Sequence, residues 1–188
     1  MAEATTLDRQ IPASLSNLPQ SPGVSLSLAP PLQRWIFRGG LDAARACGAA
    51  FGVELPTHAC HANSADGKAA LWLGPDEWLL LCAPGFGFDP RGLPGPHSVV
   101  DISHRQIGIE ISGPSAHALL NSYINLDFGT HLDTNVGTPN LGAGMSSRTV
   151  FGKVEIVLWR KSDEVYHMEV WRSFAGYVTG MLREAMHG

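Results

Sequence analysis

Residues 101 to 113 read Asp-Ile-Ser-His-Arg-Gln-Ile-Gly-Ile-Glu-Ile-Ser-Gly, and this stretch decides the fold. Within it, residues 106–112 alternate in polarity, which is the period of a strand with one buried face. Residues 98–102 read as a buried strand that comes before it. Gly113-Pro114 then open a helix over 115–123, because proline is accepted in a first helical turn. The stretch therefore predicts strand, alternating strand and helix in that order.

The rest of the second half continues in strands and ends in a helix. Residues 127–147 are rich in Gly, Thr and Asn and predict a long loop. Two strands follow, at 148–159 and 166–172, around a turn at 160–164. Ser173 can cap the last helix. One face of this helix is expected to be buried, and it holds Phe174, Tyr177, Val178, Met181, Leu182 and Ala185.

The first half shows a similar order of elements. Residues 32–38 read as a strand and residues 41–51 as an alanine-rich helix. Two apolar strands, 69–73 and 78–82, flank Gly74-Pro75-Asp76-Glu77, which is typical of a tight hairpin turn. The buried side of the helix is expected to hold Leu41, Ala44 and Phe51.

Part of the repeated order is visible in the letters. Leu71-Trp72 and Asp76-Glu77 recur in the same spacing as Leu158-Trp159 and Asp163-Glu164. The sequence therefore predicts an α+β fold of antiparallel β-sheets packed with helices, built from two related β-α-β-β units that bury their faces against each other.

Length and composition bound the organisation of the chain. The 188 residues suffice for one domain with a substantial core. Residues 1–31 carry Ser, Pro and Gln without periodicity and predict a flexible tail, so the domain is expected at 32–188. A net charge of −4 gives no electrostatic reason to bind nucleic acid or a membrane. Charged residues make up only 16%, which leaves surface that partner subunits can cover.

Location and redox state follow from simple absences in the sequence. The N-terminus lacks the basic segment and apolar run of a secretory signal. No apolar run approaches the ~20 residues that span a bilayer. Cys47, Cys60 and Cys82 are an odd number at irregular spacing and imply no disulfide framework. The cytoplasm is the expected location.

Two clusters of reactive residue types have simpler explanations. Asp101, Ser103 and His104 could form a hydrolytic triad, but residues 101 and 103 share one strand face while 104 points away. We expect them to tie the strand end to the following turn. His58, Cys60 and His61 could bind a metal, but a closed zinc site needs four ligands and no second pair stands at ligand spacing. We therefore expect no metal.

Other features point to contacts with neighbours. Gly176 and Gly180 lie four apart in the last helix and favour a close backbone approach, within this chain or to another. The tryptophans lie on strand-like segments, and most should be in the core. Any that are exposed are expected to anchor an interface, and the candidates are Trp35, Trp72, Trp78, Trp159 and Trp171.

A set of four motifs carries a family resemblance. The motifs are Ala-Leu-Trp-Leu-Gly-Pro-Asp-Glu-Trp-Leu-Leu (70–80), Asp-Ile-Ser-His-Arg-Gln (101–106), Ser-Gly-Pro-Ser-Ala-His-Ala-Leu-Leu (112–120) and Arg-Ser-Phe-Ala-Gly-Tyr (172–177). Their order resembles the gamma subunit family of heterotetrameric sarcosine oxidases, from about residue 32 to the C-terminus. Residues 101–120 also resemble the start of the folate-binding module of aminomethyltransferases of the glycine-cleavage type, and imply its fold.

The resemblance implies a complex of alpha, beta, gamma and delta subunits. Such a complex oxidises the N-methyl group of sarcosine to give glycine, hydrogen peroxide and a one-carbon unit, released as formaldehyde or passed to tetrahydrofolate. FAD, FMN, NAD and tetrahydrofolate are implied on the other subunits. This chain is implied to bind no cofactor and to be a non-catalytic accessory component.

The residues support that implication. An aminomethyltransferase carries an acidic pair just before its strand Leu-Ile-Val-Tyr-Arg, and aligning that strand with residues 156–160 places Val154 and Glu155 at the pair. Valine cannot accept a proton, and alternation turns Glu155 to the opposite face, toward solvent. The alternative is a free-standing folate-dependent aminomethyltransferase-like protein. Partner contacts are expected at the motif residues His104, Arg105, Arg172 and Phe174.

Overall fold

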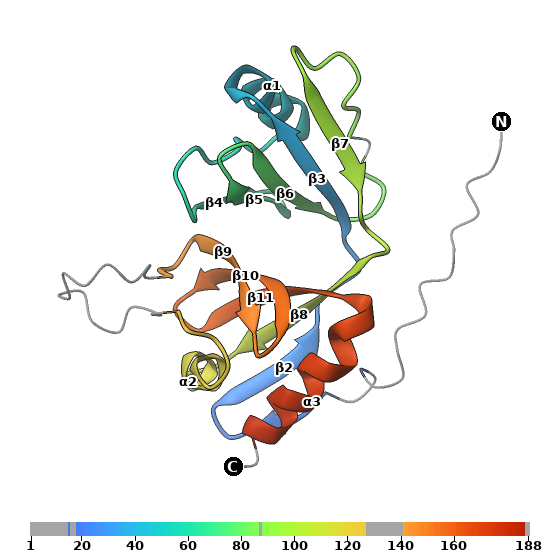
Figure 1. The fold of residues 1–188 in the computed structure, drawn as a ribbon. Coiled ribbons are helices and arrows are strands. Elements are labelled where there is room, and N and C mark those ends of the chain that lie inside the picture. The colour runs from blue at the N-terminus through green and yellow to red at the C-terminus, as the bar shows by residue number, and fades with distance from the viewer. Residues whose placement is uncertain (1–14, 16–17, 87, 127–140, 187–188) are drawn as a thin grey trace, which may run out of the picture.

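The chain forms two antiparallel sheets, as the computed structural model describes for residues 15, 18–86, 88–126 and 141–186 (Figure 1). Sheet A has the strand order β1-β2-β8-β11-β10-β9, and sheet B has the order β4-β5-β6-β3-β7. The elements are β1 (Gln20–Ser21), β2 (Val24–Leu28), β3 (Gln33–Gly39), α1 (Leu41–Phe51), β4 (Ala62–Ala65), β5 (Lys68–Gly74), β6 (Glu77–Cys82), β7 (His97–Asp101), β8 (Gln106–Ser112), α2 (Ala116–Asn121), β9 (Met145–Phe151), β10 (Val154–Ser162), β11 (Val165–Trp171), the 3-10 turn η2 (Arg172–Phe174) and α3 (Ala175–Ala185).

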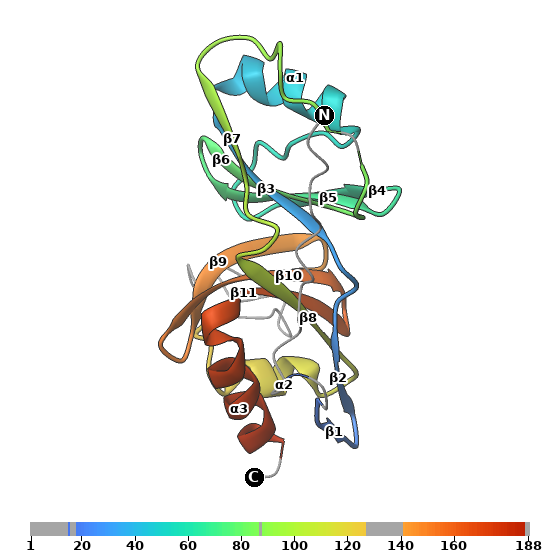
Figure 2. The ribbon, with the colours of Figure 1, turned by 90° about the vertical axis from the view of Figure 1, so that its right-hand side faces the viewer.

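The sheets face each other, and helices cover their outer faces (Figures 1 and 2). Under α1, the core of sheet B centres on Phe37, Phe51 and Trp78, which are buried. The larger core of sheet A, under α2 and α3, includes Ile109 and Tyr166. A third apolar cluster lies between the sheets and comprises Ala69, Leu71, Leu79, Leu81, Ile102 and Val157.

Each sheet contains one copy of the predicted repeat. The order β3-α1-β4-β5-β6 in sheet B matches β8-α2-β9-β10-β11 in sheet A, and the strands take the same neighbours. The strand before each unit is exchanged: β2 pairs with β8, and β7 pairs with β3. The chain therefore crosses between the sheets at 29–32 and again at 102–105. The α+β fold of two related units is confirmed, with one more strand in each unit than predicted.

The letters that suggested the repeat are not structurally equivalent. Leu71 lies between the sheets, whereas Leu158 lies under the helices of sheet A. Side chains alternate along a strand, so equivalent residues are displaced by one position from the letter match. Counted from the first residues of β6 and β11, Leu79 corresponds to His167 and Leu81 corresponds to Glu169.

Strand boundaries differ from the prediction in three places. The predicted strand 148–159 is two strands, because Gly152 (φ +60°) and Lys153 form a two-residue hairpin turn between Phe151 and Val154. β4 was missed because Ala-Asn-Ser-Ala has no alternating apolar signal. Of the predicted loop 127–147, residues 127–140 lie outside the described residues and the end belongs to β9.

Part of the predicted N-terminal tail belongs to the sheet. Residues 20–28 form β1 and β2, and Leu26 is 1% exposed. The reason is an alternation in Val-Ser-Leu-Ser-Leu, which buries every second residue against sheet A. The first part of the predicted tail, 1–14 and 16–17, lies outside the described residues.

Some side chains face differently from the prediction. Ala44 and Phe51 are buried, but Leu41 stands at the start of α1 and is 56% exposed. Val178 and Leu182 are buried in the last helix, whereas Phe174 and Tyr177 are exposed. Ser173 lies within η2 and does not cap α3, whose N-cap Phe174 makes no side-chain cap bond. The buried face of α3 consists of Ala175, Val178, Thr179 and Leu182, so the first aromatic residues lie outside it.

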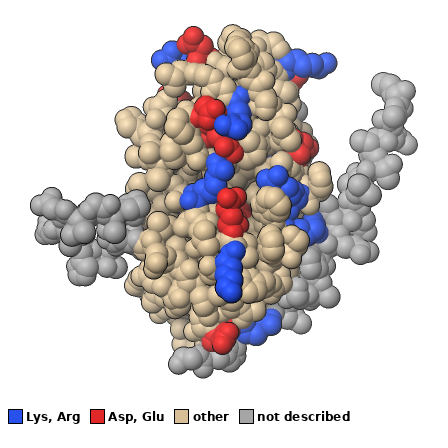
Figure 3. All heavy atoms as spheres, viewed as in Figure 1, with Lys and Arg blue, Asp and Glu red and all other residues tan. Residues whose placement is uncertain are grey.

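The surface carries few charges. On the face shown in Figure 3 most of the surface is uncharged, and acidic and basic side chains alternate along a narrow vertical line. Two ion pairs of the exposed surface are Arg38–Asp76 at 3.2 Å and Arg148–Glu77 at 2.9 Å. No helix in the described part of the chain is long and apolar enough to span a membrane.

Candidate functional site

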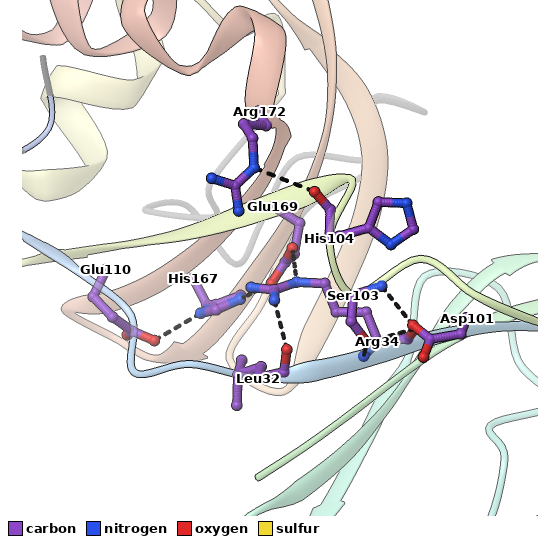
Figure 4. A network of polar contacts seen from close by, with 9 residues as sticks. All are labelled: Leu32, Arg34, Asp101, Ser103, His104, Glu110, His167, Glu169 and Arg172. Atoms are coloured by element: carbon purple, nitrogen blue, oxygen red, sulfur yellow. Dashed lines mark hydrogen bonds and ion pairs between the residues drawn. The ribbon is translucent and has the colours of Figure 1, made fainter. Parts of the chain in front are cut away.

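A chain of buried ionic residues joins the two sheets (Figure 4). Arg34 Nε of β3 donates to Glu169 Oε2 at 2.6 Å, and Glu169 Oε1 lies 2.7 Å from His167 Nε2. His167 Nδ1 lies 2.7 Å from Glu110 Oε1, and Lys161 Nζ approaches the same oxygen at 3.6 Å. The first three side chains are almost fully buried, and exposure rises toward Lys161. We call Arg34, Glu169, His167 and Glu110 the ionic cluster.

Strand alternation explains why these residues meet. His167 and Glu169 point between the sheets, while their neighbours Tyr166, Met168 and Val170 point under the helices. Glu110 pairs with His167 across β8 and β11, so the two side chains share a face. Sequence reasoning missed this cluster. Its signal was a histidine and a glutamate two apart in an otherwise apolar strand.

Arg34 also binds both segments that cross between the sheets. Its Nη1 donates to Leu32 O at 2.9 Å, in the first crossing segment. Its backbone N–H donates to Ser103 Oγ at 2.9 Å, and its carbonyl accepts from Ile102 N at 2.9 Å. The ionic cluster is therefore anchored where the two related units exchange their strands.

Electrostatics keep the cluster charged and nearly neutral in sum. Burial by itself lowers the pKa of His167, but hydrogen bonds to Glu110 and Glu169 outweigh burial and raise this pKa to about 9. Burial also acts to raise the pKa of Glu169, but His167 and Arg34 bring it below its usual range. Near neutral pH the cluster therefore holds two cations and two carboxylates.

This arrangement does not suit proton transfer. Because the pKa of His167 is raised to about 9, the ring is a cation near neutral pH, and each nitrogen then donates to a carboxylate and has no lone pair to accept another proton. A general base needs such a lone pair near the reacting atom. The cluster is suited to fixing the sheets and their crossings.

A cleft of about 470 Å³ lies beside the cluster, a size within the range of small-molecule sites. Its walls include Glu110, Lys161 and Trp159. Lys161 Nζ stands 5.5 Å from the centroid of the Trp159 ring, close to Glu110. Lys68 also lines the cleft but donates to Phe51 O at 3.2 Å. Within the cleft, Lys161 is thus engaged with Glu110, and Lys68 is engaged with a backbone carbonyl.

The predicted loss of an acidic pair agrees with the structure. Val154 is 5% exposed in the core of sheet A, and Glu155 is exposed. Glu155 does not line the cleft. Its predicted orientation toward solvent is confirmed, and alternation along β10 is the reason.

As predicted, Asp101, Ser103 and His104 do not form a hydrolytic triad. Asp101 Oδ1 accepts from Ser103 N at 2.7 Å, and Ser103 Oγ accepts from the backbone of Arg34. The His104 side chain is exposed, and its carbonyl accepts from Arg172 Nε at 3.2 Å. These residues hold the second crossing segment in place (Figure 4).

The four residues predicted as partner contacts come together on one surface. Arg172 N donates to Arg105 O at 2.8 Å, and the Arg105 guanidinium lies 4.4 Å from the Trp171 ring centroid. The Phe174 ring lies 6.5 Å from that of Trp171. Trp171 and Phe174 are 37% and 45% exposed. We call Arg105, Trp171, Arg172 and Phe174 the Trp171 patch, with His104 at its margin. Whether it binds a partner stays a prediction.

Metal-ligating and nucleophilic residues are scattered. Among the described residues, no group of three or more His, Cys, Asp or Glu is placed to hold a metal ion. The rings of His58 and His61 lie 5.5 Å apart. Burial raises the pKa of Cys47 to about 12 and that of Cys82 to about 11, which keeps both thiols protonated and inert.

Comparisons with known proteins identify the relatives of the chain. Residues 40–187 match the model of the sarcosine oxidase, gamma subunit family. A sarcosine oxidase subunit gamma from Arthrobacter sp is 29% identical over 146 residues, covering 75% of this chain and 68% of that protein. One from Corynebacterium sp. (strain P-1) is 27% identical over 142 residues, 73% of this chain and 66% of that protein. The chain therefore spans about two thirds of these relatives.

Solved structures show the same fold. A chain of heterotetrameric sarcosine oxidase from Corynebacterium sp. U-96 matches with a TM-score of 0.78 and 24% identity, covering 94% of this chain and 89% of that one. The glycine cleavage system aminomethyltransferase T from Bartonella henselae matches with a TM-score of 0.57 and 13% identity, covering 86% of this chain and 46% of that one. The predicted likeness to the aminomethyltransferase fold is confirmed.

Proposed function

We propose, because the chain belongs to the sarcosine oxidase gamma subunit family, that it is the non-catalytic accessory subunit of a heterotetrameric sarcosine oxidase. The observation that carries this proposal is the family match over residues 40–187. The proposed mechanism is indirect: burial of partner surface shifts the assembly toward its folded, cofactor-loaded form.

The chemistry of the chain supports a passive role. The imidazole of His167 is held by two carboxylates, and the position of the aminomethyltransferase acid is taken by the buried Val154. Neither residue offers a proton acceptor to a substrate amine.

The proposed partners are alpha, beta and delta subunits. FAD, FMN, NAD and tetrahydrofolate are proposed to bind to those subunits and not to this chain. The complex would oxidise sarcosine to glycine and hydrogen peroxide, with the methyl carbon released as formaldehyde or passed to tetrahydrofolate. The proposed compartment is the cytoplasm.

The proposed contact surface is the Trp171 patch together with His104. Tryptophan and arginine are the residues that most often carry binding energy at interfaces, and here both types meet on one exposed surface. Tyr177, which is 44% exposed, extends the apolar surface along α3.

Expression of the chain alone and with the other three subunits tests the role. The chain purified alone should show no flavin absorbance and no sarcosine oxidation. The co-expressed complex should contain the chain in stoichiometric amount. Flavin bound stoichiometrically to the chain alone would contradict the proposal, and so would a complex that lacks the chain.

Variants of the patch test the surface. Trp171→Ala should weaken binding to the complex by about 30-fold, the effect of losing an interface anchor worth about 2 kcal/mol. Leu41→Ala removes another exposed apolar side chain, distant in the sequence, and should leave binding unchanged. Equal effects of the two variants would remove the patch as the contact surface.

Calorimetry with tetrahydrofolate tests the alternative. A free-standing folate-dependent aminomethyltransferase-like protein should bind tetrahydrofolate without partners. The accessory role predicts no heat of binding to the chain alone.

A further inference from the structure

The outer edge of β7 is a feature that the proposed function leaves unused. β7 is the edge strand of sheet B, beside β3. Its counterpart in sheet A is the exchanged strand β2, beside β8. Trp78 and Tyr166 are equivalent, because they are the second residues of β6 and β11. Trp78 is the register partner of Phe37 in β3, and Tyr166 is the register partner of Ile111 in β8.

The same pairing identifies equivalent residues on the two exchanged strands. Phe37 is the register partner of Val99, and Ile111 is the register partner of Leu26. Both Val99 and Leu26 pack toward the helix-covered cores. Val99 therefore corresponds to Leu26.

In sheet A, a further strand covers the edge of β2. β1 pairs with it antiparallel, with Gln20 opposite Ser25 and Ser21 opposite Val24. The side chain of Gln20 adds a bond, since its Nε2 donates to Leu26 O at 2.7 Å. The outward polar groups of this edge are thus used within the chain.

The hydrogen bonds of β7 show which of its groups face outward. Ile102 N donates to Arg34 O at 2.9 Å in the register of the β3–β7 pair. Antiparallel strands alternate between residues that bond to the partner and residues that face away. Ser98 and Val100 therefore bond to β3, while His97, Val99 and Asp101 direct their N–H and C=O groups outward. Among the described residues, no other strand pairs with this edge.

The side chains of β7 leave its edge open to pairing. Val100 is 52% exposed. Residues 97–101 contain no lysine and no proline, the residues by which edge strands usually prevent pairing. An apolar side chain of an added strand would pack beside Val100.

We propose that the edge of β7 accepts an extended, apolar segment of a partner subunit, which adds to sheet B as an antiparallel strand in the position that β1 occupies in sheet A. This inference rests on the proposed function, because it needs a partner. The chain runs from β7 within three residues into His104 and Arg105, so one partner can contact both the edge and the Trp171 patch.

Amide hydrogen exchange, resolved by residue in the free chain and in the assembled complex, tests the pairing. The amides of Val99 and Asp101 should exchange about 100-fold more slowly in the complex, while those of Ser98 and Val100 are protected in both states. This alternation is the signature of an added strand. Protection of Val99 and Asp101 in the free chain that grows with its concentration would identify a second copy and overturn the assignment.

Substitution gives a second readout. Val99→Pro removes an outward N–H without removing a bond to β3, and should weaken binding to the complex about tenfold relative to Val99→Thr. Far-UV circular dichroism checks that both variants fold, and the exchange experiment on the unmodified chain stands if Val99→Pro does not. A complex that forms while Val99 remains unprotected would overturn the edge proposal alone. A chain that joins no complex would overturn the proposed function instead.

Discussion

The inner faces of the two sheets are built from equivalent strands but have opposite chemistry. β6 presents Leu79 and Leu81 between the sheets, and β11 presents His167 and Glu169 at the corresponding positions. The leucines stabilise the interface by removing apolar surface from water. The ionic residues bring a desolvation cost, which Arg34 and Glu110 offset through short hydrogen bonds. Apolar contact therefore supplies stability, while the ionic cluster fixes where the strands cross.

Removing one cation from the cluster should have the largest effect. Arg34→Met leaves Glu169 buried with only His167 as a partner, and should lower the free energy of unfolding by about 3–5 kcal/mol. Urea denaturation measures the loss. The double variant Arg34→Met/Glu169→Leu keeps His167 and Glu110 balanced and should lose less than the single variant. A double variant less stable than Arg34→Met would show that charge balance is not what the cluster provides.

The ionic face should also make stability depend on pH. The folded pKa of His167 is about 9, above its unfolded value of roughly 6.5, so protonation stabilises the folded state. This contribution, about 3 kcal/mol, should be fully present below pH 6.5 and lost as pH rises through 9. Glu169 acts in the opposite direction: its lowered pKa contributes stability above its unfolded value, and this is lost as pH falls. Urea denaturation at pH 6 and pH 9.5 measures the alkaline loss.

A variant at another histidine separates this effect from general alkaline change. His104 is exposed, so His104→Gln should keep the same pH profile. A free energy of unfolding that stays constant between pH 6 and pH 9.5 in the unmodified chain would mean that His167 is not held as a cation.

Substitution of Gly108 tests how tightly atoms pack around the ionic cluster. A Cβ at Gly108 would lie 2.7 Å from His167 Cε1 and 2.7 Å from Ala29 Cβ, so Gly108→Ala must displace the ring or the first crossing segment. We expect a loss of about 1–3 kcal/mol in urea denaturation. Gly108→Ala should also lower the pKa of His167, measured by NMR titration, because the two short hydrogen bonds lengthen. An unchanged pKa would show that the crossing segment yields and the cluster does not.

Local sequence patterns predicted most helices and strands. They could not predict the ionic cluster, because its residues are distant from one another in the sequence. The alternation in 106–112 and the alanine-rich run 41–51 gave β8 and α1 to the residue, because both signals lie within the element itself. β9 and β10 were merged because a single Gly-Lys turn is a weak signal between two apolar runs. Arg34 and Glu169 stand far apart in sequence, and only the exchange of strands brings them together. Arg105, Arg172 and Phe174 of the Trp171 patch were predicted as contacts because they belong to the quoted motifs, and Trp171 was predicted only as one of the tryptophans that would anchor an interface if exposed.

The smallest expected effect contrasts the crowded Gly108 with a glycine that has space. Among the described residues, a Cβ at Gly180 of α3 would meet nothing within 4 Å, so Gly180→Ala should stabilise the isolated chain by up to about 1 kcal/mol through helix propensity. Thermal unfolding of the free chain measures this gain. None of the described residues packs closely against this glycine, and its close approach to another chain stays a prediction. If a partner lies against this face of α3, the same variant should bind the complex less tightly while it unfolds at a higher temperature. If the variant gains both thermal stability and affinity for the complex, the partner lies elsewhere. If the free chain loses stability, the helix backbone at Gly180 has no room for a side chain.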